Sequence, residues 1–332
     1  MAMTSVETIP GSNPHRLIVG MPRGGTTAMM RALNADDRVA AFGESLFWGR
    51  AWVEPCEDGG LDAAGLERIA GLLRKKALTP RGDPGGLSDD GRDLSAAAAD
   101  VVLGMPVGSR PVKVFEAIGE AIAGQSGRRI WVEKTPHHLQ HLDRIFKAMP
   151  DARVVVMLRS PADFLRSYKH QGDRKSPEIR KVFHRLYHPM LASLVCRRGL
   201  QEGLRASKRW PDALLMVRLE EVRENPAEVM GRIRSHLRLP DFSDVEFERA
   251  NSSFEGVAKA PSPLSPVETT WLRLLVGGDA RTLDMPMPDR RVVPIRFLCS
   301  VAALIPWGIR NWKTVGRLDQ DGIRGMIRRW LR

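Results

Sequence analysis

The segment Gly20–Thr27 constrains the fold of this chain more than any other part of the sequence. Its residues, Gly-Met-Pro-Arg-Gly-Gly-Thr-Thr, follow an apolar run at 16–21 that indicates a short buried strand, and good helix formers then continue to Asn34. Glycines let the backbone N–H groups of a tight loop approach an anion, and the positive end of the following helix attracts it. We therefore expect a strand, a phosphate-binding loop and a helix, with Thr26 or Thr27 as the helix cap.

The spacing of this loop is that of nucleoside-triphosphatase loops, G-x-x-x-x-G-K-[ST], with one difference. Thr26 stands where the lysine that reaches the β- and γ-phosphates should be, which argues against ATP or GTP chemistry. Arg23 is the only cation within the loop. A P-loop nucleotide kinase or NTPase stays open as an alternative, and so does a glycine-containing turn that binds no ligand.

Strands alternate with helices along the chain. The segment Arg153–Leu158 is continuously apolar and β-branched, which is typical of a parallel strand covered on both faces. We predict an α/β fold with a P-loop-type, doubly wound parallel sheet flanked by helices. The other expected elements are strands at 39–42, 129–132 and 213–219, and helices at 137–149, 161–169, 177–209 and 226–237.

Changes in composition suggest how the chain is divided. We expect a disordered lead-in at 1–14, an α/β domain at 15–255 and a basic helical C-terminal extension at 256–332. Within the α/β domain, the segment 55–110 is expected to be a helical insertion and a candidate acceptor lid, because its part at 80–93 is rich in glycine, proline and aspartate.

A second candidate anion-binding segment follows the strand at 153–158. Arg159 comes at the carboxyl end of that strand, where α/β sheets bind ligands, and Ser167 follows about two helical turns later. A guanidinium and a hydroxyl in this arrangement can hold a second phosphate. Taken singly, each residue has a plainer interpretation, as an arginine that caps a helix end and a serine in solvent.

Together the two segments resemble the sulfotransferases that use 3′-phosphoadenosine 5′-phosphosulfate (PAPS). The resemblance is closest to the branch of tyrosylprotein-type and bacterial carbohydrate or small-molecule enzymes. It implies that the loop binds the 5′-phosphosulfate and that Arg159 and Ser167 bind the 3′-phosphate. The loop positions that match the family are Arg23, Gly24, Gly25, Thr26 and Thr27.

Two further segments extend the resemblance over roughly Leu17–Leu239. Trp131–Pro136 is similar to the family's E-K-T-P element, and Val217–Val222 with Asn225-Pro226 is similar to its R-Y-E-D-L…P segment. We assign Arg218 and Glu220 in the latter to structural roles. The departures from the family pattern are Gly24 in place of serine, Leu219 in place of an aromatic residue and Glu221 in place of aspartate.

Glu44 is the candidate catalytic base. It follows the second expected strand in the sequence Phe-Gly-Glu-Ser, and the resemblance implies that the glutamate of such an element takes the acceptor's proton. A carboxylate at a helix N-terminus is the alternative interpretation. Glu133 is a competing base, although its position in a strand favours a structural role.

Lys134 and Arg23 are the candidate cations for the leaving group. Lys134 could instead be an exposed lysine or pair with Glu133. We expect no metal site, and we assign His137, His138 and His141 to surface or capping roles rather than to metal binding.

The formal net charge of +12 predicts anionic partners. Residues 289–332 contain ten Lys/Arg and three Asp, a net charge of +7. This tail has three interpretations: a basic helix docked on the core, a contact with an anionic membrane surface, or a part of the donor or acceptor site. Neither aromatic–basic interleaving nor a recognition motif indicates nucleic-acid binding. A non-enzymatic basic protein that binds membrane or nucleic acid stays open as an alternative.

Few, widely spaced cysteines and an N-terminus without the pattern of a signal peptide predict a cytoplasmic protein. Peripheral contact with the inner membrane face through 290–332 is left open. The expected reaction is transfer of a sulfuryl group from PAPS to a hydroxyl of a glycan, glycolipid or natural product, with adenosine 3′,5′-bisphosphate as product. No sequence motif identifies the acceptor or shows whether it is acidic or lipid-linked. The oligomeric state likewise has no sequence signal.

Overall fold

The computed structural model describes residues 15–75, 78, 94–173, 176–241, 263–289 and 294–318, with side chains as far as Asn311. By compactness the chain divides into two units, and we describe each by itself. The first contains residues 1–159 and 202–250, and the second contains 160–201 and 251–332. Residues 160–201 thus group with the C-terminal segment, and the boundaries expected from composition stay a prediction.

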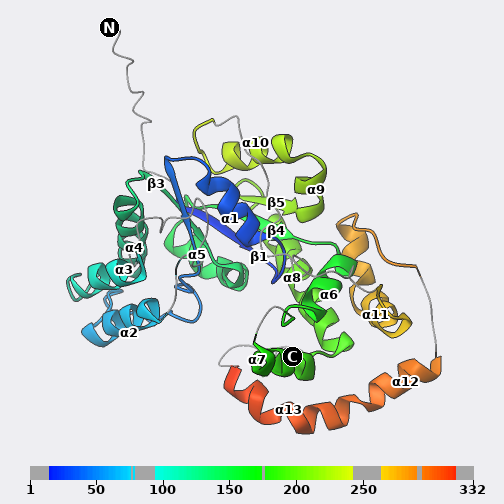
Figure 1. Ribbon diagram of the computed structural model, residues 1–332. Coiled ribbons are helices and arrows are strands. Elements are labelled where there is room, and N and C mark those ends of the chain that lie inside the picture. The colour runs from blue at the N-terminus through cyan, green and yellow to red at the C-terminus, as the bar shows by residue number, and fades with distance from the viewer. Residues whose placement is uncertain are drawn as a thin grey trace. The chain divides into compact units, whose positions relative to one another are not determined.

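Five parallel strands form the sheet of the first unit, in the order β2-β3-β1-β4-β5 (Figure 1). All residues of the strands β1 and β2, and all but the first residue of β3 and of β4, are buried, as expected for strands covered on both faces, whereas the edge strand β5 is partly exposed. The expected doubly wound α/β fold is confirmed. The strands are β1 (Arg16–Gly20), β2 (Val39–Phe42), β3 (Ile130–Lys134), β4 (Arg153–Leu158) and β5 (Leu214–Arg218).

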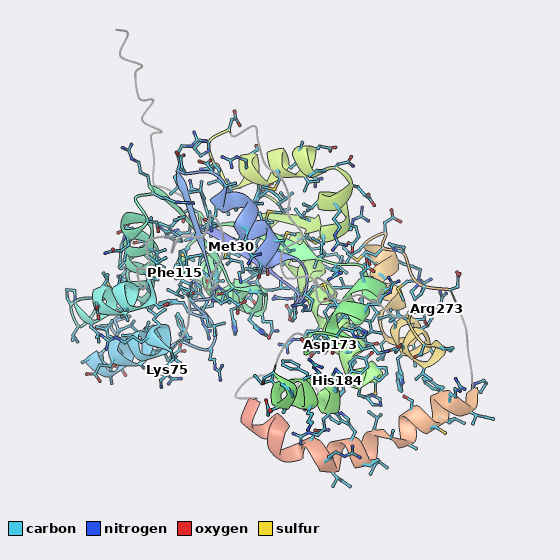
Figure 2. All side chains as sticks on the ribbon, in the orientation of Figure 1. Met30, Lys75, Phe115, Asp173, His184 and Arg273 are labelled. Atoms are coloured by element: carbon cyan, nitrogen blue, oxygen red, sulfur yellow. The ribbon has the colours of Figure 1, made fainter. Side chains whose placement is uncertain are left out.

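Alternate strand residues point to opposite faces of the sheet. On one face, Val132 and Val155 join the core formed with α1 (Thr26–Asn34), α9 (Leu219–Glu224) and α10 (Pro226–His236). On the other face, the Trp131 ring packs edge-on against Phe115 of α4 (Pro111–Gln125), with ring centroids 5.5 Å apart (Figure 2). Two further helices, α2 (Ala63–Arg74) and α3 (Leu94–Leu103), lie in the segment expected to be an insertion.

Two helices differ from the sequence-based expectation. The single helix expected at 137–149 is a 3₁₀ segment, η1 (Pro136–His141), followed by α5 (Leu142–Ala148). The long helix expected at 177–209 is broken into α7 (Pro177–Leu186) and α8 (Pro189–Arg209). The break falls directly before Pro189, where proline disfavours a helical conformation of the preceding residue.

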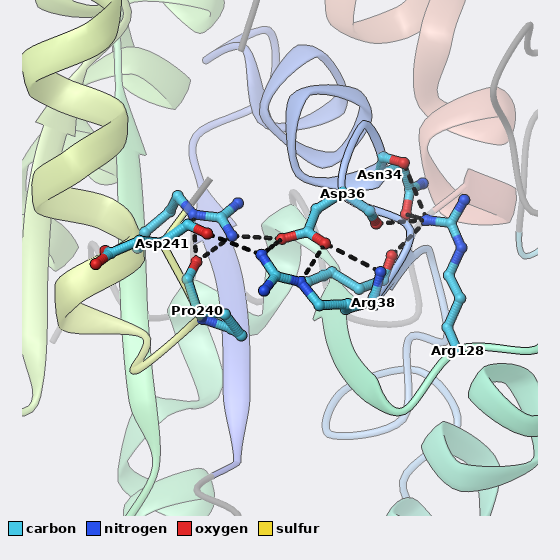
Figure 3. Close-up of polar contacts among 8 residues, drawn as sticks. Asn34, Asp36, Arg38, Arg128, Pro240 and Asp241 are labelled. Carbon is cyan, nitrogen blue, oxygen red and sulfur yellow. Dashed lines mark hydrogen bonds and ion pairs between the residues drawn. The ribbon is translucent and has the colours of Figure 1, made fainter. Parts of the chain in front are cut away.

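A buried ion cluster ties the turn between α1 and β2 to the end of α10 (Figure 3). The carboxylate of Asp36 accepts hydrogen bonds from Arg38 at 2.9 Å and from Arg234 at 2.5 Å. Arg234 also donates to the carbonyl of Pro240. Burial opposes ionisation of Asp36, but the bonds from Arg38 and Arg234 outweigh it and lower its pKa to about 2.

The second unit is helical. Besides α7 and the first part of α8, it contains α6 (Pro161–Lys169), α11 (Pro266–Thr282), α12 (Pro294–Ala302) and α13 (Leu304–Leu318). Glu268 of α11 connects two other segments of this unit, because its buried carboxylate accepts a hydrogen bond from the hydroxyl of Tyr187 at 2.6 Å and pairs with Lys169 at 3.0 Å. Near α7, Asp173 pairs with His184 (Figure 2). Among the described residues no helix meets the length and hydropathy needed to cross a membrane.

Candidate active site

The loop between β1 and α1 has the backbone geometry of an anion-binding turn. Arg23 and Gly25 both adopt left-handed conformations, with φ of 63° and 91°. Gly24 N–H donates to the carbonyl of Met21 at 3.0 Å, which closes the turn. Successive backbone N–H groups in such a turn form a concave nest for an anion, at the positive end of the following helix. The loop can therefore hold a phosphate or sulfate group.

Close packing explains the glycines of this loop. A Cβ on Gly20 would lie 2.3 Å from the carbonyl oxygen of Met157 in β4, and a Cβ on Gly25 would lie 2.6 Å from Cδ1 of Leu219. A Cβ on Gly24 would lie 2.9 Å from the carbonyl oxygens of both Met157 and Met21. The departure from the family's usual serine at Gly24 thus matches the tight packing of this particular loop.

The expectation that Thr26 or Thr27 caps the helix is wrong. The helix α1 begins at Thr26, and Gly25 is its N-cap. A left-handed N-cap suits glycine, which pays no steric penalty at positive φ. Both threonines therefore belong to the first helical turn, with Thr26 buried and Thr27 half-buried.

Arg159 lies directly after β4, beside the loop. Its Nη1 donates to the backbone carbonyl of Arg23 at 3.1 Å. The chain leaves β1 toward β2 and leaves β4 toward β5, so the crevice between β1 and β4 is the switch point of the sheet, where α/β folds bind ligands. Burial lowers the pKa of Arg23 below its ordinary value, but an arginine stays charged at neutral pH. The structure thus brings two predicted cations to this crevice.

Glu44 and Lys134 meet at the same edge of the sheet. Lys134 Nζ lies 3.0 Å from Oε1 of Glu44, and the lysine side chain is 5% exposed while the carboxylate is 38% exposed. Gly43 permits this approach, because a Cβ there would lie 2.7 Å from Cε of Lys134. The expected alternative, a pair between Lys134 and Glu133, is not the pair that the structure shows. Lys134 is also in register with Ile18 of β1, so the pair lies one strand from the loop.

Glu133 is fully buried behind this pair. One carboxylate oxygen accepts from the Ser45 hydroxyl at 2.7 Å and the Thr135 hydroxyl at 2.5 Å, and the other lies 3.1 Å from Nδ1 of His138. Burial opposes the charge, but His138, Thr135 and Ser45 outweigh it and lower the pKa of Glu133. The structure favours the structural interpretation of Glu133, which fastens the segment that follows Glu44.

His138 completes this buried network. The backbone N–H of Trp48 donates to its Nε2 at 3.2 Å, so the proton of a neutral ring lies on Nδ1, facing Glu133. Sequence reasoning missed the role of Ser45, Thr135 and His138. The available signal was their position just after two neighbouring parallel strands. Among the described residues no group of three or more His, Cys, Asp or Glu side chains is arranged to hold a metal ion.

The remaining predicted residues fall into two groups. Arg218 Nε donates to Glu221 at 2.5 Å, which matches a structural role for this arginine, and the neighbouring Leu219 packs under Gly25. Sequence reasoning did not foresee that Leu219 supports the loop. Ser167 belongs to the second unit, where it is buried in α6. Its assignment to the 3′-phosphate stays a prediction.

The parallel sheet, with an anion-binding loop at its switch point, defines an α/β protein of P-loop-like architecture. A family model described as the sulfotransferase family matches residues 14–244. The chain belongs to the sulfotransferase family, and this membership supports sulfuryl transfer as its general activity. None of the curated proteins compared with the chain matches it.

Several solved structures are similar to the chain. The sulfotransferase domain of the olefin synthase of Synechococcus PCC 7002 is 15% identical, with a TM-score of 0.49, over 86% of this chain and 100% of that one. Sulfotransferase STF9 from Mycobacterium avium is 17% identical, with a TM-score of 0.45, over 85% of this chain and 79% of its own. The sulfotransferase from Alicyclobacillus acidocaldarius is 16% identical, with a TM-score of 0.45, over 83% and 98%.

Proposed function

We propose that this protein transfers a sulfuryl group from PAPS to an acceptor hydroxyl. The observation that supports this most is the contact of Lys134 with Glu44 at the carboxyl edge of the sheet, one strand from the anion-binding loop. A base and a cation beside an anion site are what an in-line group transfer requires. The acceptor class proposed is a glycan, a glycolipid or a natural-product hydroxyl.

In the proposed reaction the acceptor oxygen forms a bond to sulfur as the bond from sulfur to the 5′-phosphate oxygen breaks. Glu44 accepts the hydroxyl proton, and its exposed carboxylate is open to an acceptor. Lys134 and Arg23 neutralise the charge that develops on the leaving phosphate. Because fixed side-chain cations perform this task, the proposal requires no metal ion.

The loop residues 23–27 are proposed to hold the 5′-phosphosulfate, and Arg159 the 3′-phosphate. Arginine suits the latter role because its planar fork makes paired hydrogen bonds to phosphate oxygens. Ser167 carries the same assignment by resemblance to the family. The product would be adenosine 3′,5′-bisphosphate.

Donor binding is tested by thermal shift with adenosine 3′,5′-bisphosphate, compared with ATP and Mg²⁺. We expect stabilisation by the bisphosphate, and at least a tenfold loss of affinity in Arg159→Ala and in Ser167→Ala. Stabilisation by ATP and Mg²⁺ alone would favour the kinase alternative. Unchanged affinity in the Arg159 variant would contradict the proposed donor site.

The base is tested with radiolabelled PAPS and a panel of hydroxyl acceptors. We expect Glu44→Gln to lower kcat by about 10²–10⁴-fold while the affinity for adenosine 3′,5′-bisphosphate is unchanged. The matched control is Glu67→Gln, at an exposed position of α2. If Glu44→Gln keeps full activity with every acceptor that the protein uses, Glu44 is not the base.

A further inference from the structure

The helices α12 and α13 have an inner face of aromatic and polar residues and an outer face of aliphatic ones. Phe297, Ser300, Trp307 and Asn311 recur at intervals of three to seven residues and face the body of the second unit. Ile295, Leu298, Ile305 and Ile309 lie on the opposite side and are between 65% and 77% exposed. An exposed stripe of aliphatic side chains on a helix is favourable only when an apolar partner covers it.

The inner face packs against other helices of the second unit. The Phe297 ring packs on Trp271 of α11, with centroids 4.7 Å apart, and Nε1 of Trp271 donates to the hydroxyl of Ser300 at 2.9 Å. Further along, the buried Asn311 donates to the carbonyl of Arg185 in α7 at 3.3 Å. These contacts fix which side of the helix pair faces outward.

The outer side chains form one continuous stripe. The backbone N–H of Ala303 donates to the carbonyl of Cys299 at 2.9 Å, and that of Trp307 donates to the carbonyl of Ala303 at 3.1 Å. The helical path therefore continues from α12 into α13 (Figure 1). Positions 295, 298, 302, 305 and 309 therefore share a face, with alanine at 302. The stripe is about 20 Å long, from a rise of 1.5 Å per residue.

Charge indicates what would cover this stripe. The segment 294–318 contains Arg296, Arg310, Lys313 and Arg317 and has neither Asp nor Glu. Both Arg296 and Arg310 are exposed. A second copy of the same face would bring these like charges together, which opposes self-association. An anionic lipid surface offers both an apolar layer for the stripe and negative headgroups for the arginines.

We propose that the outer face of α12 and α13 binds the surface of a bilayer that contains anionic lipids. The helix pair lies in the plane of the interface, with Ile295, Leu298, Ile305 and Ile309 among the acyl chains. Arg296 and Arg310 contact the headgroups. This inference is independent of the proposed sulfuryl transfer.

The test is co-sedimentation of the full chain with vesicles of phosphatidylcholine and phosphatidylglycerol in about a 3:1 ratio, compared with pure phosphatidylcholine. We expect binding to the anionic vesicles that is at least tenfold stronger than to the neutral ones, and that weakens as salt is raised. Equal binding to both vesicles, or absence of binding to the anionic ones, would overturn the proposal.

Two double variants separate the apolar and the electrostatic contributions to vesicle binding. Ile305→Asp with Ile309→Asp removes half of the stripe, and Arg296→Glu with Arg310→Glu reverses the exposed charges. We expect each pair to lower the partition coefficient at least tenfold. The matched control is Leu274→Asp in α11, which changes an equally exposed leucine (65%) of the same unit and should leave binding unchanged.

Light scattering without lipid measures the oligomeric state and so tests the alternative that a second copy of the chain covers the stripe. If the wild type is a dimer that Ile305→Asp with Ile309→Asp dissociates, and neither form sediments with vesicles, the face is an interface between copies and the proposal is wrong. Circular dichroism of each variant confirms that loss of binding is not loss of folding. We expect unchanged spectra, because all four substituted side chains are exposed.

Discussion

Glu133 links the buried interior to the site at the level of a single residue. Its carboxylate accepts hydrogen bonds from Ser45, which follows Glu44, and from Thr135, which follows Lys134. The segments that follow β2 and β3 are therefore both held by the same buried carboxylate. The positions of the candidate base and of its cation therefore depend on a buried carboxylate that binds the residue after each of them.

We predict that Glu133→Gln destabilises the protein by about 2–3 kcal/mol. The amide nitrogen would place a donor opposite Nδ1 of His138 or opposite the two hydroxyls, so one buried group would lose its acceptor. Urea unfolding measures the change. Glu67→Gln on the exposed face of α2 is the control, and equal midpoints for the two variants would contradict the structural role of Glu133.

Asp36 makes stability depend on pH in the acid range. Its pKa in the folded protein is about 2, below the ordinary value of 3.8, so its contribution is complete above the ordinary pKa and is lost as pH falls through the folded one. We predict that the wild type loses on the order of 2 kcal/mol between about pH 4 and pH 2 through this group.

The matching variant is Asp36→Asn, whose side chain does not ionise. At neutral pH we expect it to be about 3 kcal/mol less stable than the wild type, because Arg234 is left buried without its carboxylate. The difference between the two proteins should shrink toward pH 2 in chemical denaturation. A difference that is constant with pH would show that the ionised Asp36 carboxylate is not what stabilises the cluster.

At the scale of elements, two glycines differ in whether a side chain would fit. One lies in the loop between β1 and α1, and the other lies in the helix α2. Gly25 has positive φ and lies against Leu219, whereas Gly71 in α2 has open space where a Cβ would be. We predict that Gly25→Ala weakens adenosine 3′,5′-bisphosphate binding at least tenfold and costs about 1–2 kcal/mol of stability. Calorimetric titration and thermal unfolding measure the two effects.

Gly71→Ala is the matched substitution for Gly25→Ala. In a helix interior with open space, alanine should raise stability by about 0.5–1 kcal/mol and leave bisphosphate binding unchanged. If both variants bind the bisphosphate as the wild type does, the conformation of Gly25 is not needed for the donor loop.

At the scale of the whole molecule, the net charge of +12 acts over long distances. We predict that the association rate of adenosine 3′,5′-bisphosphate falls severalfold as NaCl is raised from about 0.05 to 0.5 M, because the screening length shrinks from more than 10 Å to about 4 Å. Stopped-flow fluorescence measures the rate. Uncharged adenosine is the control ligand, and an equal salt effect on both ligands would contradict electrostatic steering.

Much of the secondary structure could be predicted from the sequence. Arg153–Leu158 and Pro161–Lys169 form the strand and helix with the expected bounds, because β-branched runs and a proline at the first helical position are local signals. The break between α7 and α8 and the 3₁₀ form of η1 were missed. Buried contacts of His138 accompany the latter, and no local pattern encodes them.

The glycine-rich loop and the segment Arg159–Ser167 could each be recognised from the sequence alone, because each consists of residues that are close together in the chain. The pairing of Lys134 with Glu44, across 90 residues, was decided only by the tertiary structure. The strand order places β3 between β2 and β1, and Gly43 lets the lysine approach. Two other features also depend on which surfaces pack together in the folded chain: the contact of Leu219 with Gly25 and the exposed stripe of α12 and α13. Local sequence patterns do not specify that packing.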